Sequence, residues 1–144
     1  MSTSPNQFTF PFIDDGSGTG TLCAGAVVEI QAANGSWQPF TFMLDTGAFA
    51  VSLSSSVGQQ LGLNPANATN VDQVSGVDDQ AQKAYQYNVQ ARFHGMTTPF
   101  KAPIPIIVMP DQGDMLLGRM NFWGAIISTI LIDCIHQQTT FTLA

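Results

Sequence analysis

Apolar and polar residues alternate along most of the chain, a pattern typical of β-strands with one buried face. Residues 22–32 alternate in this way and lead into Asn34-Gly35, a dipeptide that favours a tight hairpin turn. Residues 40–44 are predicted to form the returning strand, which ends at Asp45. The pattern therefore predicts a hairpin that delivers a carboxylate to the end of a strand.

A second, longer hairpin is predicted from residues 71–77 and 81–91, with Asp78-Asp79 near its tip. Its second arm mixes polar and apolar residues, which suits a ribbon that faces solvent or covers a cleft. Residues 125–143 predict two further strands with a break near residues 136–138. Strands therefore dominate the expected fold.

Other segments carry signals for helices or irregular strands. Ser54-Ser55-Ser56 offers a side-chain cap for a short helix that ends near Gly62, and residues 120–124 predict another short helix. The apolar run over residues 103–110 contains three prolines. Because proline cannot donate to a strand ladder, this run predicts an edge strand or an irregular strand.

Composition indicates one domain without nucleic acid or membrane partners. The 144 residues are 44% hydrophobic and 10% charged, enough chain to bury a core. Four scattered Lys and Arg residues and a net charge of −6 argue against nucleic-acid binding. We expect one domain over residues 1–144, with residues 1–20 as a flexible N-terminal arm or dimer strand.

The chain shows no export signal and no membrane span. Residues 1–7 lack the basic start and the apolar run of a signal peptide. The longest apolar stretch, residues 125–132, is far shorter than the roughly 20 residues that cross a bilayer. A cytoplasmic protein is the simplest expectation.

Cysteines and histidines lack the spacing of metal ligands. Cys23 and Cys134 lie in apolar, β-like surroundings, which predicts buried, reduced thiols. His94 and His136 are expected to have polar or capping roles. No metal or other cofactor is expected.

The strongest chemical signal is Phe42-Met43-Leu44-Asp45-Thr46-Gly47-Ala48, where an apolar run breaks into a turn at a carboxylate. Gly47 permits an unusual dihedral angle or a close backbone approach. Such turns are common in hairpins, so the motif needs support from elsewhere. Met115-Leu116-Leu117-Gly118-Arg119, about seventy residues after Asp45, supplies it.

Together these segments resemble the retropepsin family, which comprises retroviral aspartic proteases and their cellular and bacterial relatives. The match runs in order from about Leu22 to Leu143, and Leu61-Gly62-Leu63 is more similar to the cellular and bacterial branch. The resemblance implies an all-β fold: a closed β-barrel with a flap hairpin and one or two short helices.

The resemblance also implies an aspartic endopeptidase acting on extended peptides or proteins. Enzymes of this type use two carboxylates that share one proton, because like charges about 3 Å apart cannot both ionise. Asp45, Thr46 and Gly47 are the catalytic residues on this interpretation. The chain has one Asp-Thr-Gly, so the second Asp45 is expected from another copy in a homodimer.

Further roles follow from the same resemblance. The substrate-binding residues are expected to be Ala48, Phe49, Ser75, Gly76 and Val77, the last three near the flap tip. Plausible subsite walls are the apolar residues Phe49, Val51, Val77, Ile104 and Ile106. In the family, terminal strands commonly pair between subunits, which here implicates residues 8–12 and 139–143.

Two features depart from the retroviral pattern. Asp78-Asp79 stands where a glycine-rich flap tip is expected, and Phe49-Ala50 replaces acidic residues that would pair with Arg119. Two alternatives therefore remain open. One is a catalytically silent peptide-binding or assembly module of the same fold, and the other is an unrelated all-β binding domain with coincidental turns. Dimerisation and Asp45-dependent cleavage would distinguish the three.

Overall fold

Strands are the main regular secondary structure of the computed structural model, which describes residues 6–75, 81–110, 113 and 115–144. A short helix and one 3-10 turn interrupt them. In chain order the elements are β1 (Gln7–Pro11), β2 (Ile13–Asp14), β3 (Leu22–Cys23), β4 (Gly25–Gln31), β5 (Trp37–Leu44), β6 (Val51–Leu53), α1 (Ser55–Gln60), η1 (Pro65–Asn67), β7 (Asn70–Ser75), β8 (Ala81–Val89), β9 (Ala91–Phe93), β10 (Ile104–Val108), β11 (Leu116–Leu117), β12 (Ile127–Asp133) and β13 (Gln138–Leu143).

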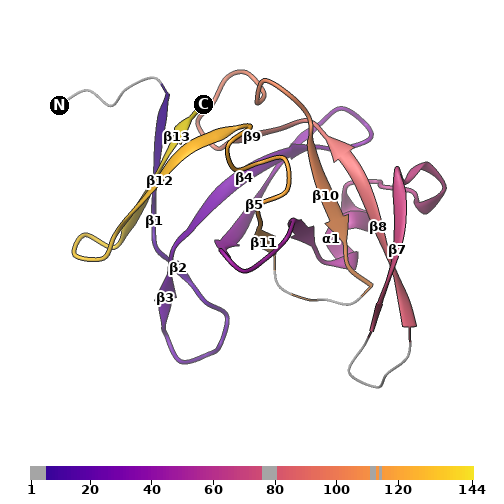
Figure 1. The fold of residues 1–144 in the computed structure, drawn as a ribbon, viewed down its shortest axis with the longest axis horizontal. Coiled ribbons are helices and arrows are strands. Elements are labelled where there is room, and N and C mark those ends of the chain that lie inside the picture. The colour runs from indigo at the N-terminus through magenta and orange to yellow at the C-terminus, as the bar shows by residue number, and fades with distance from the viewer. Residues whose placement is uncertain (1–5, 76–80, 111–112, 114) are drawn as a thin grey trace.

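The strands form one large sheet and two small ones (Figure 1). Eight strands follow the order β7-β8-β10-β6-β11-β5-β4-β9, three follow the order β1-β13-β12, and β2 pairs with β3. The predicted all-β architecture is confirmed. Pairing among the described strands ends at β7 and β9, so closure of the barrel stays a prediction.

The hairpin of β4 and β5 follows the predicted pattern. The two strands pair from Gly25↔Met43 to Gln31↔Trp37. At the turn Gly35 adopts a positive φ of 89° and its N–H donates to the carbonyl of Ala32 at 2.9 Å. Glycine reaches this conformation without steric cost, and so the Asn-Gly dipeptide sets the register that carries β5 to Asp45.

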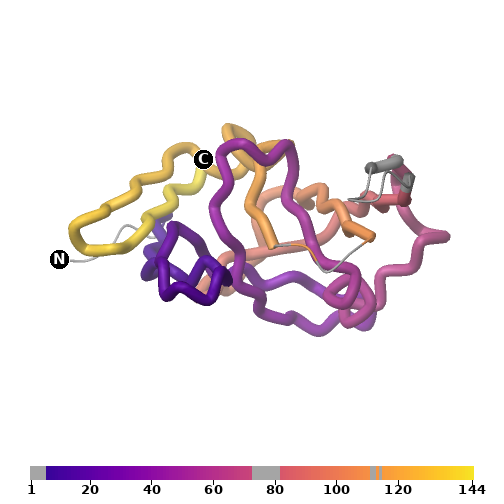
Figure 2. The backbone as a smooth tube through the Cα atoms, turned by 90° about the horizontal axis from the view of Figure 1, so that it is seen from below, coloured from indigo at the N-terminus to yellow at the C-terminus, as the bar shows by residue number. Residues whose placement is uncertain are grey.

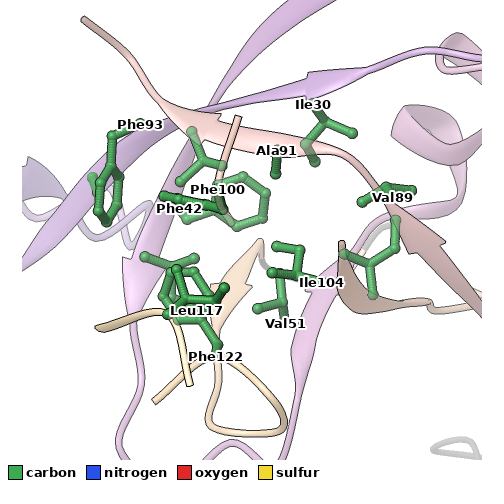
Figure 3. Close-up of a cluster of buried hydrophobic side chains, with 14 of the residues drawn as sticks. Ile30, Phe42, Val51, Val89, Ala91, Phe93, Phe100, Ile104, Leu117 and Phe122 are labelled. Atoms are coloured by element: carbon green, nitrogen blue, oxygen red, sulfur yellow. The ribbon is translucent and has the colours of Figure 1, made fainter. Parts of the chain in front are cut away.

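The core is a cluster of aromatic rings that joins the three-stranded sheet to the large sheet. The Phe93 ring on β9 is fully buried, and its centroid lies 4.9 Å from that of Phe141 and 5.5 Å from that of Phe10. Phe100 and Phe122 extend the cluster toward β11 (Figure 3). Thus the N-terminal and C-terminal strands share one core with the strands of the large sheet.

Of the two short helices predicted from the sequence, the one after Ser54 is present and the one at residues 120–124 is not. α1 begins after Ser54, whose hydroxyl accepts a hydrogen bond from the N–H of Val57, as predicted. The predicted helix at residues 120–124 is wrong, because this segment forms turns. Asn121 and Gly124 have φ values of 51° and 80°, and these left-handed conformations interrupt a right-handed helix.

The proline-containing strand lies inside the sheet, not at its edge. β10 pairs antiparallel with β8 and parallel with β6, so the prediction of an edge or irregular strand is wrong. Pro105 pairs with Asn88 of β8 and precedes Ile106, the first residue that pairs with β6. The missing N–H is therefore tolerated, because the parallel ladder starts one residue later.

The two cysteines are not buried, contrary to the prediction. Cys134 is exposed because it lies in the turn between β12 and β13. Cys23 is half-buried in β3, whose partner strand β2 belongs to the smallest sheet. Its partial burial raises the pKa of the thiol, and the nearby carboxylates of Asp15 and Asp14 add to the effect.

Candidate active site

The structure places the two sequence motifs side by side. β11 pairs parallel with β5, so that Leu117 lies opposite Leu44. The N–H of Asp45 donates to the carbonyl of Leu117 at 3.2 Å, and the N–H of Leu44 donates to the carbonyl of Ala24 at 2.9 Å. The end of β5 is therefore held from both sides, and the position of Asp45 is set by main-chain hydrogen bonds.

The active-site loop, residues 45–50, carries the carboxylate at its start. The N–H of Gly47 donates to Oδ1 of Asp45 at 2.9 Å, which orients the carboxylate. The N–H of Ala48 donates to the carbonyl of Asp45 at 3.2 Å. Asp45 is half-buried, whereas Thr46 and Gly47 are exposed. The carboxylate is thus fixed in direction and remains accessible to water.

Gly47 does not have the unusual dihedral angle that the sequence suggested. It is not among the residues with positive φ. A Cβ placed on it would meet only Oδ1 of Asp45, at 3.4 Å, an ordinary contact. Within one chain, neither backbone conformation nor packing demands glycine at this position.

Gly118 is the glycine that packing does demand. A Cβ at this position would lie 2.2 Å from the carbonyl oxygen of Ala50 and 2.4 Å from its carbonyl carbon. Backbone atoms cannot move aside as a side-chain tip can, so only glycine allows β11 to approach the loop this closely. The sequence named this residue only as part of a motif and did not reveal the reason for it.

Arg119 and Met120 hold the far end of the active-site loop. The N–H of Arg119 donates to the carbonyl of Phe49 at 3.1 Å, and the N–H of Met120 donates to the same carbonyl at 2.7 Å. Nε of Arg119 donates to the carbonyl of Ala48 at 3.3 Å. In the part of the chain that the structure describes, Arg119 forms no ion pair, so its side chain acts on the loop backbone instead.

An open hollow of about 330 Å³ lies beside this loop. Ala48 and Phe49, both predicted for substrate binding, line it, and the Phe49 side chain is 65% exposed. The remaining lining residues were not identified from the sequence: Ala50, Ser52, Ile107, Met109, Gly113 and Leu116. Its walls are mainly apolar, which suits apolar side chains of a ligand.

Strand alternation explains which predicted subsite walls are wrong. Val51, Ile104 and Ile106 are at most 1% exposed and belong to the core. Their neighbours Ser52 and Ile107 point to the opposite face of the sheet and line the hollow. The period-2 pattern of these strands would have separated the two sets once one core position was known.

A larger hollow, of about 400 Å³, lies between α1 and β8. Tyr87 and Tyr85 form part of its wall, and the pKa of Tyr87 is raised by burial and by the neighbouring Tyr85. Its described lining contains Lys83 but no Asp or Glu side chain. No Asp or Glu is part of the described lining of either hollow, but the smaller one is lined by Ala48, Phe49 and Ala50 of the active-site loop, which begins at Asp45, and it is therefore the better candidate.

The predicted long hairpin is present. β7 and β8 pair from Asn70↔Gln86 to Ser75↔Ala81. Ser75 is the last residue of β7, while Gly76, Val77 and Asp78-Asp79 lie outside the described residues.

The described residues show no cluster of three or more His, Cys, Asp or Glu side chains suited to a metal ion. They also include no helix with the length and hydropathy needed to cross a membrane.

Two comparisons with known proteins both match the chain to aspartic proteases. Residues 27–121, most of the chain, match the family described as "Aspartyl protease". A retropepsin-like aspartic protease from Rickettsia conorii has a similar crystal structure, with a TM-score of 0.61 and 18% sequence identity. The similarity covers 100% of this chain and 98% of that one, and at this identity it shows the fold alone. No curated protein matches the chain.

Proposed function

Because this chain belongs to the aspartyl protease family and has a retropepsin-like fold, we propose that it is an aspartic endopeptidase completed by a second copy of itself. The observation that carries the proposal is the half-buried carboxylate of Asp45, held by the N–H of Gly47 in a loop whose following residues, Ala48 and Phe49, line an open, mainly apolar hollow. A single chain supplies one such carboxylate. The proposed unit is therefore a two-fold homodimer whose site lies on the symmetry axis.

In this dimer the two Asp45 carboxylates share one proton, since like charges about 3 Å apart cannot both ionise. The ionised carboxylate takes a proton from water, and the water oxygen bonds to the scissile carbonyl carbon. The protonated carboxyl gives its proton to the carbonyl oxygen. The tetrahedral species then collapses: the C–N bond breaks as the nitrogen takes up a proton, and acid and amine products leave.

The neighbours of Asp45 support this chemistry. Thr46 is exposed at the turn, where its hydroxyl can bond to the facing loop of the second copy. Gly47, for which one chain alone gives no packing reason, leaves room for the substrate backbone or the partner loop. Both residues therefore have proposed functions that lie outside the isolated chain.

The hairpin of β7 and β8 is proposed as the flap that covers an extended substrate. Ser75, Gly76 and Val77 are proposed to donate or accept main-chain hydrogen bonds with that substrate, as in strand addition. Ala48 and Phe49 contact the side chains next to the scissile bond. Because the hollow is mainly apolar, we expect preference for hydrophobic side chains there.

Cleavage of a mixed peptide library at about pH 5 by wild-type protein and by Asp45→Asn tests the proposal. Asparagine keeps the shape of the side chain but cannot share the proton, so we expect cleavage to fall by about 10²–10⁴-fold or more. Asp14→Asn, a change in an exposed β2 carboxylate, is the matched control and should cleave like the wild type.

Equal cleavage by wild type and Asp45→Asn would contradict the proposal and indicate another mechanism or a contaminant. Peptide binding by the wild type without any cleavage would also contradict it. That second result would favour a catalytically silent peptide-binding or assembly module of the same fold.

A further inference from the structure

The larger hollow, between α1 and β8, has no part in the proposed peptidase chemistry, because its described lining contains neither Asp45 nor its loop. Its volume of about 400 Å³ lies within the range of sites that hold small molecules. Its wall comes from α1 and the loop that follows, from β8 and from the end of β10, and includes Gln59, Leu63, Lys83, Tyr85, Tyr87 and Val108. Segments from three parts of the chain thus enclose a space of ligand size.

The larger and the smaller hollow open on opposite faces of the sheet at β10. Val108 lines the larger hollow and its neighbour Ile107 lines the smaller one, since adjacent side chains of a strand point to opposite faces. Met109, just beyond the end of β10, borders both. β7 and β8 lie at the end of the molecule opposite the β12–β13 hairpin (Figure 2). The larger hollow is therefore a second site on the other face of the sheet, far from the three-stranded sheet.

Gly58 lets α1 lie close to β10 at one wall of this hollow. A Cβ at this position would lie 2.8 Å from Cγ1 of Val108 and 3.2 Å from its Cγ2. Because the branched side chain of valine is stiff, a larger residue would push the helix away from the sheet. Glycine is a poor helix former, so its place within α1 is explained by this close approach. Packing therefore sets the shape of the hollow before any ligand enters.

Lys83 gives the larger hollow a positive charge. It is the one charged residue of the described lining, and its side chain is exposed. It forms no ion pair with any residue in the part of the chain that the structure describes. The protein has a net charge of −6 and only four Lys and Arg residues. An anion that enters this hollow thus meets a cation that no described carboxylate neutralises.

Tyr85 and Tyr87 supply aromatic surface beside that charge. Residues 83, 85 and 87 alternate along β8 and so share one face of the strand. Tyr87 is 6% exposed and Tyr85 is half-buried. Burial raises the pKa of Tyr87, with a further contribution from Tyr85, so that its hydroxyl keeps its proton at neutral pH. Among the described residues no hydrogen bond occupies either hydroxyl, and both are free to donate to an anion.

We propose that the larger hollow binds a small organic anion, whose apolar body lies against Tyr85 and Tyr87 while its carboxylate pairs with Lys83. Leu63 and Val108 provide further apolar contact for the body of the ligand. A hydrogen bond between an ammonium and a carboxylate is stronger than one between neutral groups. The site therefore distinguishes an anion from an uncharged molecule of the same shape.

Isothermal titration calorimetry of the full chain with naphthoate and with its uncharged amide, naphthamide, tests the site. We expect the wild type to bind naphthoate more tightly than naphthamide. Lys83→Gln removes the charge and should weaken naphthoate binding about fivefold. Gln59→Lys adds a cation on the α1 wall and should tighten it about threefold. Neither substitution should change the affinity for naphthamide.

Two control variants test where naphthoate binds. Lys101→Gln removes an exposed cation that lines a different hollow, and Phe49→Ala removes the exposed ring of the smaller hollow. Both should bind naphthoate like the wild type. Thermal unfolding should show that all four variants fold, because all four positions are exposed.

A wild-type chain that binds no naphthoate would overturn the inference, as would equal affinity for naphthoate and naphthamide or unchanged binding by Lys83→Gln. Weaker binding by Lys101→Gln or Phe49→Ala would place the anion in another hollow and would also overturn it. Binding that depends on Lys83 would uphold this site even if the protein cleaved no peptide, so the two proposals fail independently.

Discussion

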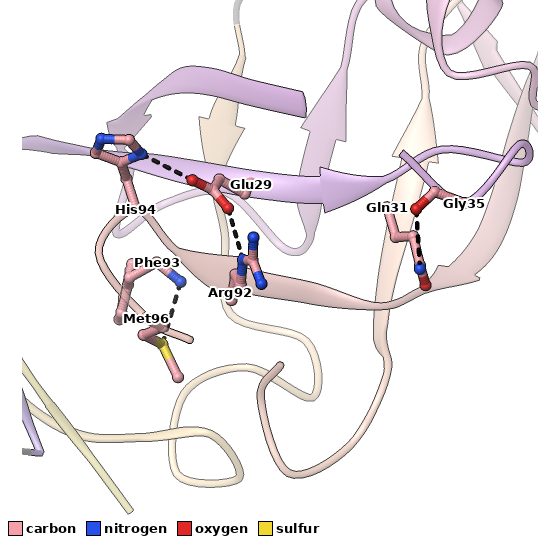
Figure 4. Close-up of polar contacts among 7 residues, drawn as sticks. All are labelled: Glu29, Gln31, Gly35, Arg92, Phe93, His94 and Met96. Atoms are coloured by element: carbon pink, nitrogen blue, oxygen red, sulfur yellow. Dashed lines mark hydrogen bonds and ion pairs between the residues drawn. The ribbon is translucent and has the colours of Figure 1, made fainter. Parts of the chain in front are cut away.

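At the scale of single residues, Glu29 anchors a charged cluster on the face of β4 opposite the core, since its neighbours Val28 and Ile30 are buried. Its carboxylate accepts from Nε of Arg92 at 2.6 Å and lies 2.8 Å from Nδ1 of His94 (Figure 4). The Arg92 guanidinium in turn lies 4.2 Å from the centroid of the Trp37 ring. Burial acts to raise the pKa of Glu29, but the hydrogen bonds and charges of Arg92 and His94 outweigh it and lower that pKa.

We therefore predict that Glu29→Gln lowers the free energy of unfolding at pH 7 by about 1–3 kcal/mol, because charged hydrogen bonds are lost. A lowered folded-state pKa contributes stability above the unfolded value of about 4.5, and this stability disappears as the pH falls through the folded value. Urea unfolding at pH 7 and at about pH 3 measures the difference. The wild type and the variant should differ much less in acid.

Asp72→Asn, a change in an exposed carboxylate of β7, is the control for that experiment and should shift stability little at either pH. A Glu29→Gln effect of the same size at both pH values would show that the ion pair is not its source.

At the scale of elements, the ring cluster around Phe93 determines how the three-stranded sheet sits on the large one. Phe93 comes from the short β9, while Phe8 and Phe10 come from β1 and Phe141 from β13. The ring centroids lie 4.9 to 5.7 Å apart, the range of favourable aromatic pairs. β12 is attached to the rest of the protein through this same contact, because it pairs with β13.

Phe93→Ala should lower the free energy of unfolding by about 3–5 kcal/mol, since it removes a fully buried ring and leaves a cavity. Phe49→Ala removes a ring that is 65% exposed and should change stability by no more than about 0.5 kcal/mol. Denaturant titration of both variants measures the two values. Equal losses would mean that the cluster does not hold the sheets together.

At the scale of the whole molecule, the proposed active unit is larger than the chain. Each chain supplies one Asp45, and the proposed mechanism needs two. Catalysis would then depend on protein concentration as well as on the groups at the site. An enzyme that worked as a monomer would show no such dependence.

Mixing wild type with Asp45→Asn distinguishes these cases. If subunits exchange freely and both carboxylates are required, an equal amount of variant should lower the activity of a fixed amount of wild type to roughly one half. A threefold excess should lower it to roughly one quarter. The rate of peptide cleavage after equilibration is the measurement, with an inert protein added in the same amounts as the control.

Unchanged activity at every ratio would mean that one Asp45 per active unit is enough. The two-carboxylate mechanism across a two-fold axis would then be wrong, even if Asp45→Asn alone abolished cleavage.

The hairpin turn, the helix cap and the turn that carries Asp45 could be predicted from the sequence, because each depends on a few neighbouring residues. Asn34-Gly35 turns one hairpin and Ser54 caps α1, and in both cases the hydrogen bond spans only three residues. The turn after β5 likewise depends on Asp45 and Gly47, which are two residues apart. Local chemistry of this kind does not need the rest of the chain.

The position of β10 in the sheet and the faces of its side chains depended on strands that are distant in sequence. Pro105 suggested an edge strand, yet β10 lies between β8 and β6 because its register starts the parallel ladder one residue later. Ile106 was expected to line a subsite, but it faces the core while its neighbour Ile107 faces the hollow. Because both residues are isoleucine, the sequence alone does not show which of the two side chains faces the core.

The sequence by itself thus determined the all-β class, the two hairpins and the carboxylate at the end of β5, since alternation and turn residues act over short range. Only the tertiary structure decided that Gly118 must lack a side chain, that Arg119 bonds the active-site loop, and that β12 keeps a free edge. Each of these follows from the packing of segments about seventy residues apart in sequence or from the order of strands in a sheet. Such contacts exist only once the chain has folded.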